Sequence, residues 1–308
     1  MVDLDALSAA FRQHGRLVRV VVAEARGSAP REAGASMLVG PDGLISGTIG
    51  GGALELEAIA TARACTAGRV DRRALGPDLG QCCGGAVTLA YDVIEALPEV
   101  QSGAILRRID GPEEMPLSVR RVLAGQRNGT SQGTTLIDGW LLDPVERRDT
   151  QVWVWGAGHV GRAIVATLAP LPGLAVTWID TAPDRFPETV PEGVTTVPAA
   201  APERLAAHAP GMAHHLILTY SHALDLALCD AVLRRGFASA GLIGSKSKWA
   251  RFRSRLTAMG HPTARIESIS CPIGDPSLGK HPQEIAVGVA VRLLRETAHK
   301  DAKRDMTG

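Results

Sequence analysis

The sequence predicts an α/β protein with an N-terminal α+β domain over residues 1–145 and a C-terminal Rossmann-like domain, built on a doubly wound parallel sheet, over residues 146–308. The first observation behind this prediction is the segment Gln151–Gly161, in which a short apolar run leads directly into three closely spaced glycines. Such a run is typical of a strand that is buried on both faces of a parallel sheet. The second observation is that apolar runs and helical patterns alternate from there to residue 294, as they do in successive βα units.

The glycine turn has the sequence context of a dinucleotide-binding fingerprint. Gly156, Gly158 and Gly161 follow the strand, and the apolar residues after them fall on one face of a helix. Such a turn lets backbone approach a phosphate closely, and the start of the helix offers free N–H donors. A second strand ends at Asp180, where a carboxylate usually takes a ribose hydroxyl. Asp180 and the turn residue His159 are candidate ligand contacts, although the fold does not identify the ligand.

Composition excludes several classes of protein. The chain has 308 residues, of which 45% are hydrophobic and 21% are charged, and its formal net charge is +1. This balance gives no electrostatic reason to expect a nucleic acid or an anionic membrane as partner. No apolar stretch approaches the ~20 residues of a membrane helix, and residues 1–20 lack the apolar core of a signal peptide. The five cysteines form no disulfide framework, so we expect reduced thiols and a cytoplasmic location.

The N-terminal half predicts a small mixed fold. Asp3 is a candidate N-cap for a first helix, and 17–23 is a valine-rich strand. Residues 35–48 predict a β-hairpin around the turn Gly40-Pro41-Asp42-Gly43. The next helix carries a buried face of four residues, namely Leu54, Ala58, Ala62 and Cys65.

Two loops of this half are candidate ligand loops. The turn-rich loop that ends in Arg31 is either a plain connection or an anion grip, because the guanidinium fork suits phosphate. Gly50, Gly51 and Gly52 form either a tight turn or a loop that a ligand approaches closely. Glu55 complements the dipole of the helix that follows and would repel a phosphate, but it is able to accept hydrogen bonds from a ring amino group.

A doubled cysteine stands in a glycine-rich loop before a strand over 86–93. Gln81, Cys82 and Cys83 precede two glycines, and two thiols on such a loop are badly placed for packing. They are well placed for a soft metal, for thiolate chemistry or for redox exchange. No second pair of Cys or His stands at zinc spacing, so we do not expect a structural zinc site.

The C-terminal half continues the alternation of strands and helices. Weak signals over 97–150 suggest a helix at 119–123 and a hairpin arm at 134–142, and the charged segment 143–149 is taken as the domain boundary. Further strands are predicted at 194–197, 216–219, 238–243 and 266–270, with a last helix over 282–294 and a frayed tail from 297. Strand ends place His222, Asp225, Ser245 and Lys246 at the edge where ligands bind, and Lys246 suits a phosphate.

The order of these motifs resembles the XdhC/CoxI family, the accessory proteins of xanthine dehydrogenase and related molybdenum hydroxylases. The resemblance covers the chain from about Arg16 to Leu294. It is carried by the ordered motifs Gly27-Ser28-Ala29-Pro30-Arg31, Gly50-Gly51-Gly52-x-Leu54-Glu55, Cys83-Gly84-Gly85, Gly156-Ala157-Gly158-His159-Val160-Gly161, Gly241-Leu242-Ile243-Gly244-Ser245-Lys246-x-Lys248, Pro272-Ile273-Gly274 and Pro282-x-Glu284-Ile285-Ala286-Val287. The doubled cysteine looks like the version found among partners of bacterial xanthine dehydrogenases. One departure is the link Asp275–Lys280, which is longer than the family's usual one.

The resemblance implies a chaperone that binds the molybdenum cofactor (Moco), holds it while a cysteine desulfurase adds the terminal sulfido ligand, and helps to insert it into apo-xanthine dehydrogenase. A molybdopterin nucleotidyltransferase is a further candidate partner, and the family leads us to expect a homodimer. Carried onto this chain, the first candidates are Cys82 and Cys83, either of which is a candidate molybdenum contact. The loop from Thr48 to Glu55 and the turn at 156–161 follow.

Two alternatives stay open at this point. An NAD(P)-dependent oxidoreductase would use His222 or Lys246 as its acid–base group, with Asp180 favouring NAD over NADP. A nucleotide-sensing regulatory module would bind a nucleotide without turnover and would have no use for Cys82 and Cys83.

Overall fold

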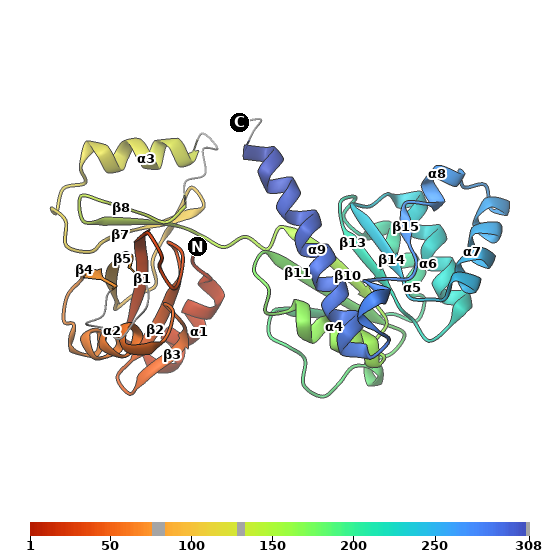
Figure 1. The fold of residues 1–308 in the computed structure, drawn as a ribbon, viewed down its shortest axis with the longest axis horizontal. Coiled ribbons are helices and arrows are strands. Elements are labelled where there is room, and N and C mark those ends of the chain that lie inside the picture. The colour runs from red at the N-terminus through yellow and green to blue at the C-terminus, as the bar shows by residue number, and fades with distance from the viewer. Residues whose placement is uncertain (76–83, 128–132, 306–308) are drawn as a thin grey trace. The chain divides into compact units, whose positions relative to one another are not determined.

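The structure is a computed structural model that describes residues 1–75, 84–127 and 133–305. It divides into two compact units, Met1–Glu146 and Arg147–Thr307 (Figure 1). Among the described residues, no helix combines the length and the apolar composition that a membrane span requires.

The first unit is built on a five-stranded antiparallel sheet with the order β3-β2-β1-β5-β4. Its elements are α1 (Leu4–His14), β1 (Leu17–Arg26), β2 (Ser36–Gly40), β3 (Gly43–Gly47), α2 (Gly52–Ala64), β4 (Arg69–Ala74) and β5 (Ala86–Ile94). The expected hairpin is the pair β2–β3, and the expected N-cap is confirmed, since Asp3 Oδ1 accepts from the backbone N–H groups of Asp5 and Ala6 at 3.0 Å. β4 had no prediction, because four of its six residues are polar or charged.

A second, four-stranded sheet completes this unit, with the order β6-β7-β9-β8. Its elements are β6 (Val100–Gln101), β7 (Ala104–Arg108), α3 (Leu117–Arg127), β8 (Thr135–Ile137) and β9 (Trp140–Pro144). The predicted helix at 119–123 lies within α3. The segment expected to be one hairpin arm holds β8 and most of β9, which turn at Asp138 and Gly139 with positive φ angles of 48° and 75°.

The valine-rich strand β1 is buried on both faces, which explains its unbroken apolar run. Val20 and Val22 pack in one cluster with Leu54 of α2. Val21 faces the other way and packs with Leu141 of the second sheet. The apolar run, which is more typical of a parallel sheet, here marks an antiparallel strand sandwiched between a helix layer and a second sheet.

A buried ion pair joins the two sheets of the first unit. Arg19 of β1 is 1% exposed and pairs with Asp143 of β9, which is 0% exposed. Asp143 also accepts a hydrogen bond from Thr134 Oγ1 at 2.7 Å. The two units divide after Glu146, inside the charged segment 143–149 that was taken as the boundary. Asp143 itself belongs to β9, where its carboxylate neutralises a guanidinium that would otherwise be buried without a counter-charge.

The second unit is a doubly wound sheet of six parallel strands in the order β12-β11-β10-β13-β14-β15. Its strands are β10 (Thr150–Trp155), β11 (Leu174–Asp180), β12 (Val194–Pro198), β13 (His214–Ile217), β14 (Ser239–Leu242) and β15 (Ile269–Ser270). The chain changes its winding direction between β10 and β13. Ligands of such sheets bind beyond the carboxyl ends of the strands at this point. The predicted Rossmann-like fold is confirmed.

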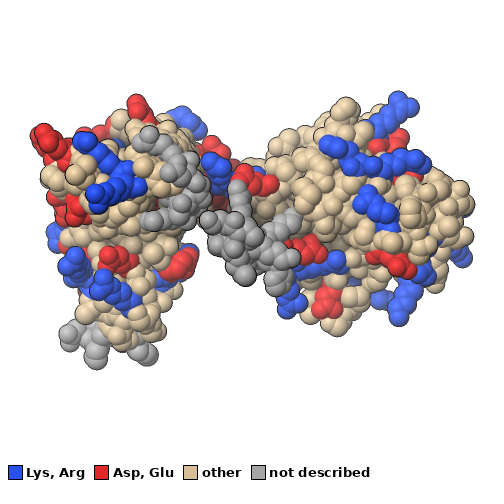
Figure 2. Space-filling model, turned by 90° about the horizontal axis from the view of Figure 1, so that it is seen from above, with Lys and Arg blue, Asp and Glu red and all other residues tan. Residues whose placement is uncertain are grey.

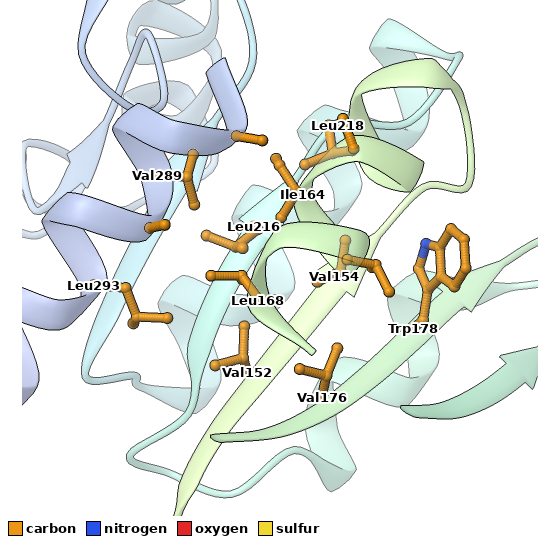
Figure 3. Packing of buried hydrophobic residues seen from close by; sticks show 14 of the residues in the cluster. Val152, Val154, Ile164, Leu168, Val176, Trp178, Leu216, Leu218, Val289 and Leu293 are labelled. Atoms are coloured by element: carbon orange, nitrogen blue, oxygen red, sulfur yellow. The ribbon is translucent and has the colours of Figure 1, made fainter. Parts of the chain in front are cut away.

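Helices cover both faces of this sheet (Figure 1). They are α4 (His159–Leu168), α5 (Pro202–Leu205), α6 (His222–Arg235), α7 (Lys246–Ala258), α8 (Thr263–Ile266) and α9 (Pro282–Asp305), with short 3-10 turns η2 (Pro183–Arg185), η3 (Ala206–His208) and η4 (Pro276–Leu278). On one face, Ile164 of α4 and Val289 of α9 pack on Val154 and Leu216 of the strands (Figure 3). On the other face, Leu228 of α6 packs in a cluster with residues of α7 and α8.

Three predicted boundaries in this unit are corrected. β13 begins at His214 and ends at Ile217, earlier than predicted, because two buried histidines stand at its start. Residues 263–266 form α8, so that only Ile269 and Ser270 of the predicted sixth strand pair as β15. The last helix continues to Asp305, where a frayed tail from residue 297 was predicted.

Candidate functional site

Three loops of the first unit meet at one end of its five-stranded sheet. A Cβ atom added to Gly50 would stand 2.4 Å from the Cβ of Pro30. One added to Gly85 would stand 2.5 Å from the carbonyl oxygens of both Arg26 and Ser28. These approaches need glycine, and they pack three predicted motifs into one surface, here called the loop cluster: residues 27–31, 48–52 and 84–85.

The register of the sheet explains why these loops meet. Arg26, the last residue of β1, pairs with Ala86, the first residue of β5. The chain after β1 and the chain before β5 therefore leave the sheet at the same end. The backbone N–H of Leu75, just after β4, donates to the carbonyl oxygen of Gly85 at 2.8 Å. This hydrogen bond ties Gly85 to the chain that leaves β4.

Glu55 organises the glycine loop from inside. Its Oε2 accepts hydrogen bonds from Thr48 Oγ1 at 2.5 Å and from the backbone N–H groups of Ile49 at 2.9 Å and Gly51 at 3.1 Å. Burial opposes ionisation of this carboxyl, but the hydrogen bonds outweigh burial and lower its pKa below the ordinary value. α2 begins without a capping side chain. The N–H groups of Ile49 and Gly51, however, are already bonded within the loop.

Arg31 lies at the exposed rim of the loop cluster. Its Nε and Nη2 donate to the two carboxylate oxygens of Glu32 at 3.2 and 3.0 Å. These hydrogen bonds lower the pKa of Glu32 to about 2. An anion that reaches Arg31 must therefore compete with, or displace, an exposed carboxylate.

The predicted cysteine motif directly precedes Gly84 of this cluster in the sequence. Gln81, Cys82 and Cys83 lie outside the described residues, and their predicted roles stay predictions. Gly84 is the first described residue after them, and apart from its chain neighbours no described residue has an atom within 4 Å of the place where a Cβ would stand. The same is true of Gly51. Backbone at these two positions of the loop cluster is therefore open to an approaching molecule. Within the described ranges, no group of three or more His, Cys, Asp or Glu side chains is arranged to hold a metal ion.

The glycine turn of the second unit has the expected close packing. A Cβ on Gly161 would stand 2.0 Å from the carbonyl oxygen of Gly156, whereas Gly158 faces open space. Gly158 begins α4 without a side-chain cap, and the first turn of the helix holds no acidic residue. His159, the first helical residue, is exposed.

Asp180 is placed beside this turn, but its carboxylate is engaged. Oδ2 accepts from the N–H of Ala157 in the turn, and Oδ1 accepts from the N–H of Thr181, both at 2.6 Å. Arg185 Nε lies 3.4 Å from Oδ1, and Asp180 is only 4% exposed. A ribose hydroxyl would have to compete with these donors, so the predicted ribose role of Asp180 stays a prediction.

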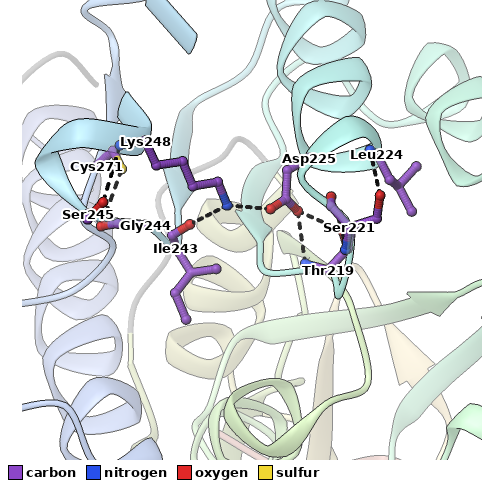
Figure 4. Close-up of polar contacts among 9 residues, drawn as sticks. All are labelled: Thr219, Ser221, Leu224, Asp225, Ile243, Gly244, Ser245, Lys248 and Cys271. Atoms are coloured by element: carbon purple, nitrogen blue, oxygen red, sulfur yellow. Dashed lines mark hydrogen bonds and ion pairs between the residues drawn. The ribbon is translucent and has the colours of Figure 1, made fainter. Parts of the chain in front are cut away.

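The remaining candidates follow the carboxyl ends of β13 and β14, and Figure 4 shows two of them, Asp225 and Ser245. Ser245 is the N-cap of α7 and accepts from the N–H of Lys248 at 3.2 Å. Lys246 and His222 are exposed first residues of their helices. Asp225 is fully buried and accepts from Lys248 Nζ at 2.6 Å and from Thr219 Oγ1 at 2.7 Å.

Sequence reasoning missed the ion pair of Lys248 with Asp225. The cation donates also to the carbonyl oxygen of Ile243 at 2.9 Å, so it ties α7 to α6 and to the end of β14. The position of Asp225 was a signal in the sequence, because it lies in α6 four residues after the N-cap Ser221. In the structure this carboxylate is buried and needs a partner. Also missed was Tyr220, an exposed ring whose centroid lies 4.9 Å from the guanidinium carbon of Arg185.

Comparisons with known proteins give matches across both units. A family model described as the XdhC Rossmann domain matches residues 152–293, and a model described as the XdhC and CoxI family matches residues 10–74. The uncharacterized protein YqeB of Escherichia coli (strain K12) is 27% identical over 288 residues, which is 89% of this chain but 42% of that protein. The chain thus spans about two fifths of the length of this curated relative.

A solved structure shares the architecture of the whole chain. The crystal structure of a xanthine dehydrogenase from Bacillus halodurans superposes with a TM-score of 0.66 and 16% sequence identity, covering 97% of this chain and 96% of that chain. At this identity the likeness shows a common fold and nothing further.

Proposed function

The chain belongs to the XdhC and CoxI family, and from this we propose that it is an accessory protein in the maturation of xanthine dehydrogenase rather than an enzyme with a turnover of its own. Family membership supports an accessory role for which xanthine dehydrogenase is the target enzyme.

The finer proposal is that the loop cluster holds the molybdenum cofactor as cargo. The observation that carries it is the meeting of Gly50 with Pro30 and of Gly85 with Arg26 and Ser28. Residues far apart in the sequence are thereby joined to one surface, and the doubled cysteine directly precedes Gly84 of this surface in the sequence. A molecule bound there would touch several of the motifs that carry the family resemblance.

The residues of the loop cluster fit the chemistry of such a cargo. Moco carries a phosphate, a flat pterin ring with N–H donors, and a molybdenum dithiolene. Arg31 would attract the phosphate, in competition with Glu32. The carbonyl oxygens of the loops would accept from ring N–H groups, while Glu55 keeps the glycine loop rigid. Cys82 and Cys83 would supply soft thiolates near the metal end and exclude water from it.

The second unit is proposed to complete this role in one of two ways. The uncapped start of α4 and the exposed Lys246 suit a phosphate, whether from the cofactor or from a nucleotide. An NAD(P)-dependent oxidoreductase or a nucleotide sensor is the alternative function built on the same edge, and it would bind nucleotide without needing the loop cluster.

The proposed partners follow from the cargo. Apo-xanthine dehydrogenase would receive the cofactor, a cysteine desulfurase would act on it while it is held, and a molybdopterin nucleotidyltransferase would deliver it. We further propose a homodimer that works in the cytoplasm.

Retention of free cofactor tests the proposal. The protein is incubated anaerobically with Moco and gel-filtered, and molybdenum and pterin per chain are then measured. We expect near-stoichiometric retention in the wild type and its loss when Cys82 and Cys83 are both replaced by alanine. Cys271→Ala, which removes a half-buried thiol of the second unit, is the matched control and should retain cofactor. If the wild type retains none, the carrier role is wrong. If the double variant retains it fully, the thiols are not the metal contact.

A further inference from the structure

One region of the second unit has a charge composition unlike the rest of the chain. The chain as a whole is balanced, with 33 Lys and Arg against 32 Asp and Glu. Residues 231–266, however, contain eight Lys or Arg and no Asp or Glu. Figure 2 shows blue side chains grouped at the end of this unit where Figure 1 places α7 and α8.

Half of these cations are used within the fold. Arg234 pairs with Asp230, Lys248 with Asp225, and Arg235 and Arg265 donate to backbone carbonyl groups. The other four stand on α7, are exposed, and form no ion pair within the described part of the chain; they are Lys246, Arg251, Arg253 and Arg255. The free positive charge is thus concentrated on one helix.

The helix presents these cations in two rows. Phe252 and Leu256 are buried and fix which side of α7 faces the sheet. On the opposite side, a track of small exposed residues runs along the helix at helical spacing: Ser247, Ala250, Ser254 and Thr257. With 100° per residue, Lys246 and Arg253 flank one side of this track, and Arg251 and Arg255 flank the other. The 13 residues of α7 make this surface about 20 Å long.

We propose that this face of α7 is the docking surface for an acidic face of the partner protein, the apo-dehydrogenase that receives the cargo. This inference rests on the proposed function for the identity of the partner. The two rows of cations flank the track of small residues on α7. A partner helix or loop with acidic side chains on both of its sides fits this surface, because opposite charges then meet on both sides of the contact. The small residues allow that helix or loop to approach closely.

The same face does not suit the other anionic surfaces. Single-stranded nucleic acids are held by aromatic side chains on which the bases stack, and the exposed side of α7 carries none. A membrane-bound helix inserts large apolar residues below its cations, whereas the large apolar residues of α7 pack into the core of the unit, Phe252 and Leu256 fully and Trp249 in part.

Neutralising this face should weaken docking in a salt-dependent manner. The test compares the wild type with R251S/R253S/R255S, and with R12S/R120S/R121S as a control that removes three exposed cations from the first unit. Binding to immobilised apo-xanthine dehydrogenase is measured at about 0.01 M and about 0.15 M salt, where the Debye length is about 30 Å and about 8 Å. Each exposed ion pair changes a binding constant about two- to threefold, so we expect about tenfold weakening at low salt and less at high salt. The control should bind as the wild type does.

Competition experiments distinguish an acidic protein from DNA and from a membrane as the molecule that binds α7. They also separate failure of the docking surface from failure of the proposed function. Poly-L-glutamate should compete for α7, while a 20-base-pair DNA duplex and vesicles containing phosphatidylglycerol should compete more weakly at equal charge. Equal binding of the dehydrogenase by the wild type and the α7 variant overturns the docking inference and leaves the proposed function standing. Stronger competition by DNA or vesicles also overturns it. If the wild type does not bind the dehydrogenase, the proposed partner is wrong, and equal binding of poly-L-glutamate by the wild type and the α7 variant then overturns the docking surface as well.

Discussion

The packing of the loop cluster makes a sharp prediction for two adjacent glycines. Gly85→Ala adds a methyl group 2.5 Å from the carbonyl oxygens of Arg26 and Ser28, and 2.9 Å from the carbonyl carbon of Ser28. All three atoms belong to backbone, so no side chain is able to rotate away. Gly84→Ala adds the same methyl group one residue earlier, where no described residue beyond the chain neighbours has an atom within 4 Å.

The expected effects differ in size and in sign. Forcing a methyl group into packed backbone costs about 1–3 kcal/mol, so Gly85→Ala should destabilise the loop cluster by this amount. Gly84→Ala restricts the unfolded chain without a clash and should be neutral or stabilising by about 0.4–1 kcal/mol.

Hydrogen exchange resolved by peptide mass spectrometry is the assay, because it reports on this part of the first unit alone. In Gly85→Ala, amides of 17–40 and 86–94 should exchange about 5- to 150-fold faster, while the second unit is unchanged. In Gly84→Ala, exchange should match the wild type or slow. If the two variants exchange alike, the loops do not meet as described.

Three further predictions concern titratable side chains. Glu55→Gln keeps a hydrogen-bond acceptor but loses the charge, and should destabilise the first unit by about 1–2 kcal/mol at pH 7 in urea unfolding. Because folding lowers the pKa of Glu55, the difference in stability between the wild type and the variant should shrink as pH falls through the titration range of the carboxyl. Burial lowers the pKa of His215 from 6.5 to about 4, so the free energy of unfolding of the wild type should fall by up to about 3 kcal/mol between pH 6.5 and pH 4, with no loss above that range. His215→Asn keeps an acceptor for Trp155 Nε1 and should remove this pH dependence. Lys248→Met leaves the buried Asp225 without its counter-charge and should lower the free energy of unfolding in urea by about 3–5 kcal/mol. Adding Asp225→Asn should recover part of that loss. A double variant no more stable than the single one would contradict the pairing.

The Rossmann-like half was the easier part to predict because its signals are local. The apolar run before Gly156 and the spacing of the glycines are set by backbone geometry within a few residues. Its errors fall where tertiary packing overrides local pattern. His214 and His215 look polar, yet His215 is buried against Trp155 and accepts its indole N–H, so the strand starts earlier than its apolar residues suggest.

The first unit was harder because its order depends on partners far away in the sequence. Arg19 and Asp143 are 124 residues apart, and neither charge reveals alone that it is buried with the other. The same holds for the site. The motifs at Gly27–Arg31 and Gly84–Gly85 were visible one by one, but only the register of β1 with β5 brings them together. The internal use of Glu55 and Asp180 was not foreseen, since a carboxylate that bonds its own loop and one that awaits a ligand look alike in sequence.

The most direct test of the account is transfer of cargo between two proteins. The chain is loaded with Moco and freed of excess cofactor, then mixed anaerobically with apo-xanthine dehydrogenase, and molybdenum in each protein is followed together with dehydrogenase activity. The account predicts that molybdenum leaves the chain as it appears in the dehydrogenase, that activity rises faster than with the same amount of free cofactor, and that the Cys82/Cys83 double alanine variant gives no such advantage. Equal activation by free cofactor, with molybdenum remaining on the chain, would contradict it.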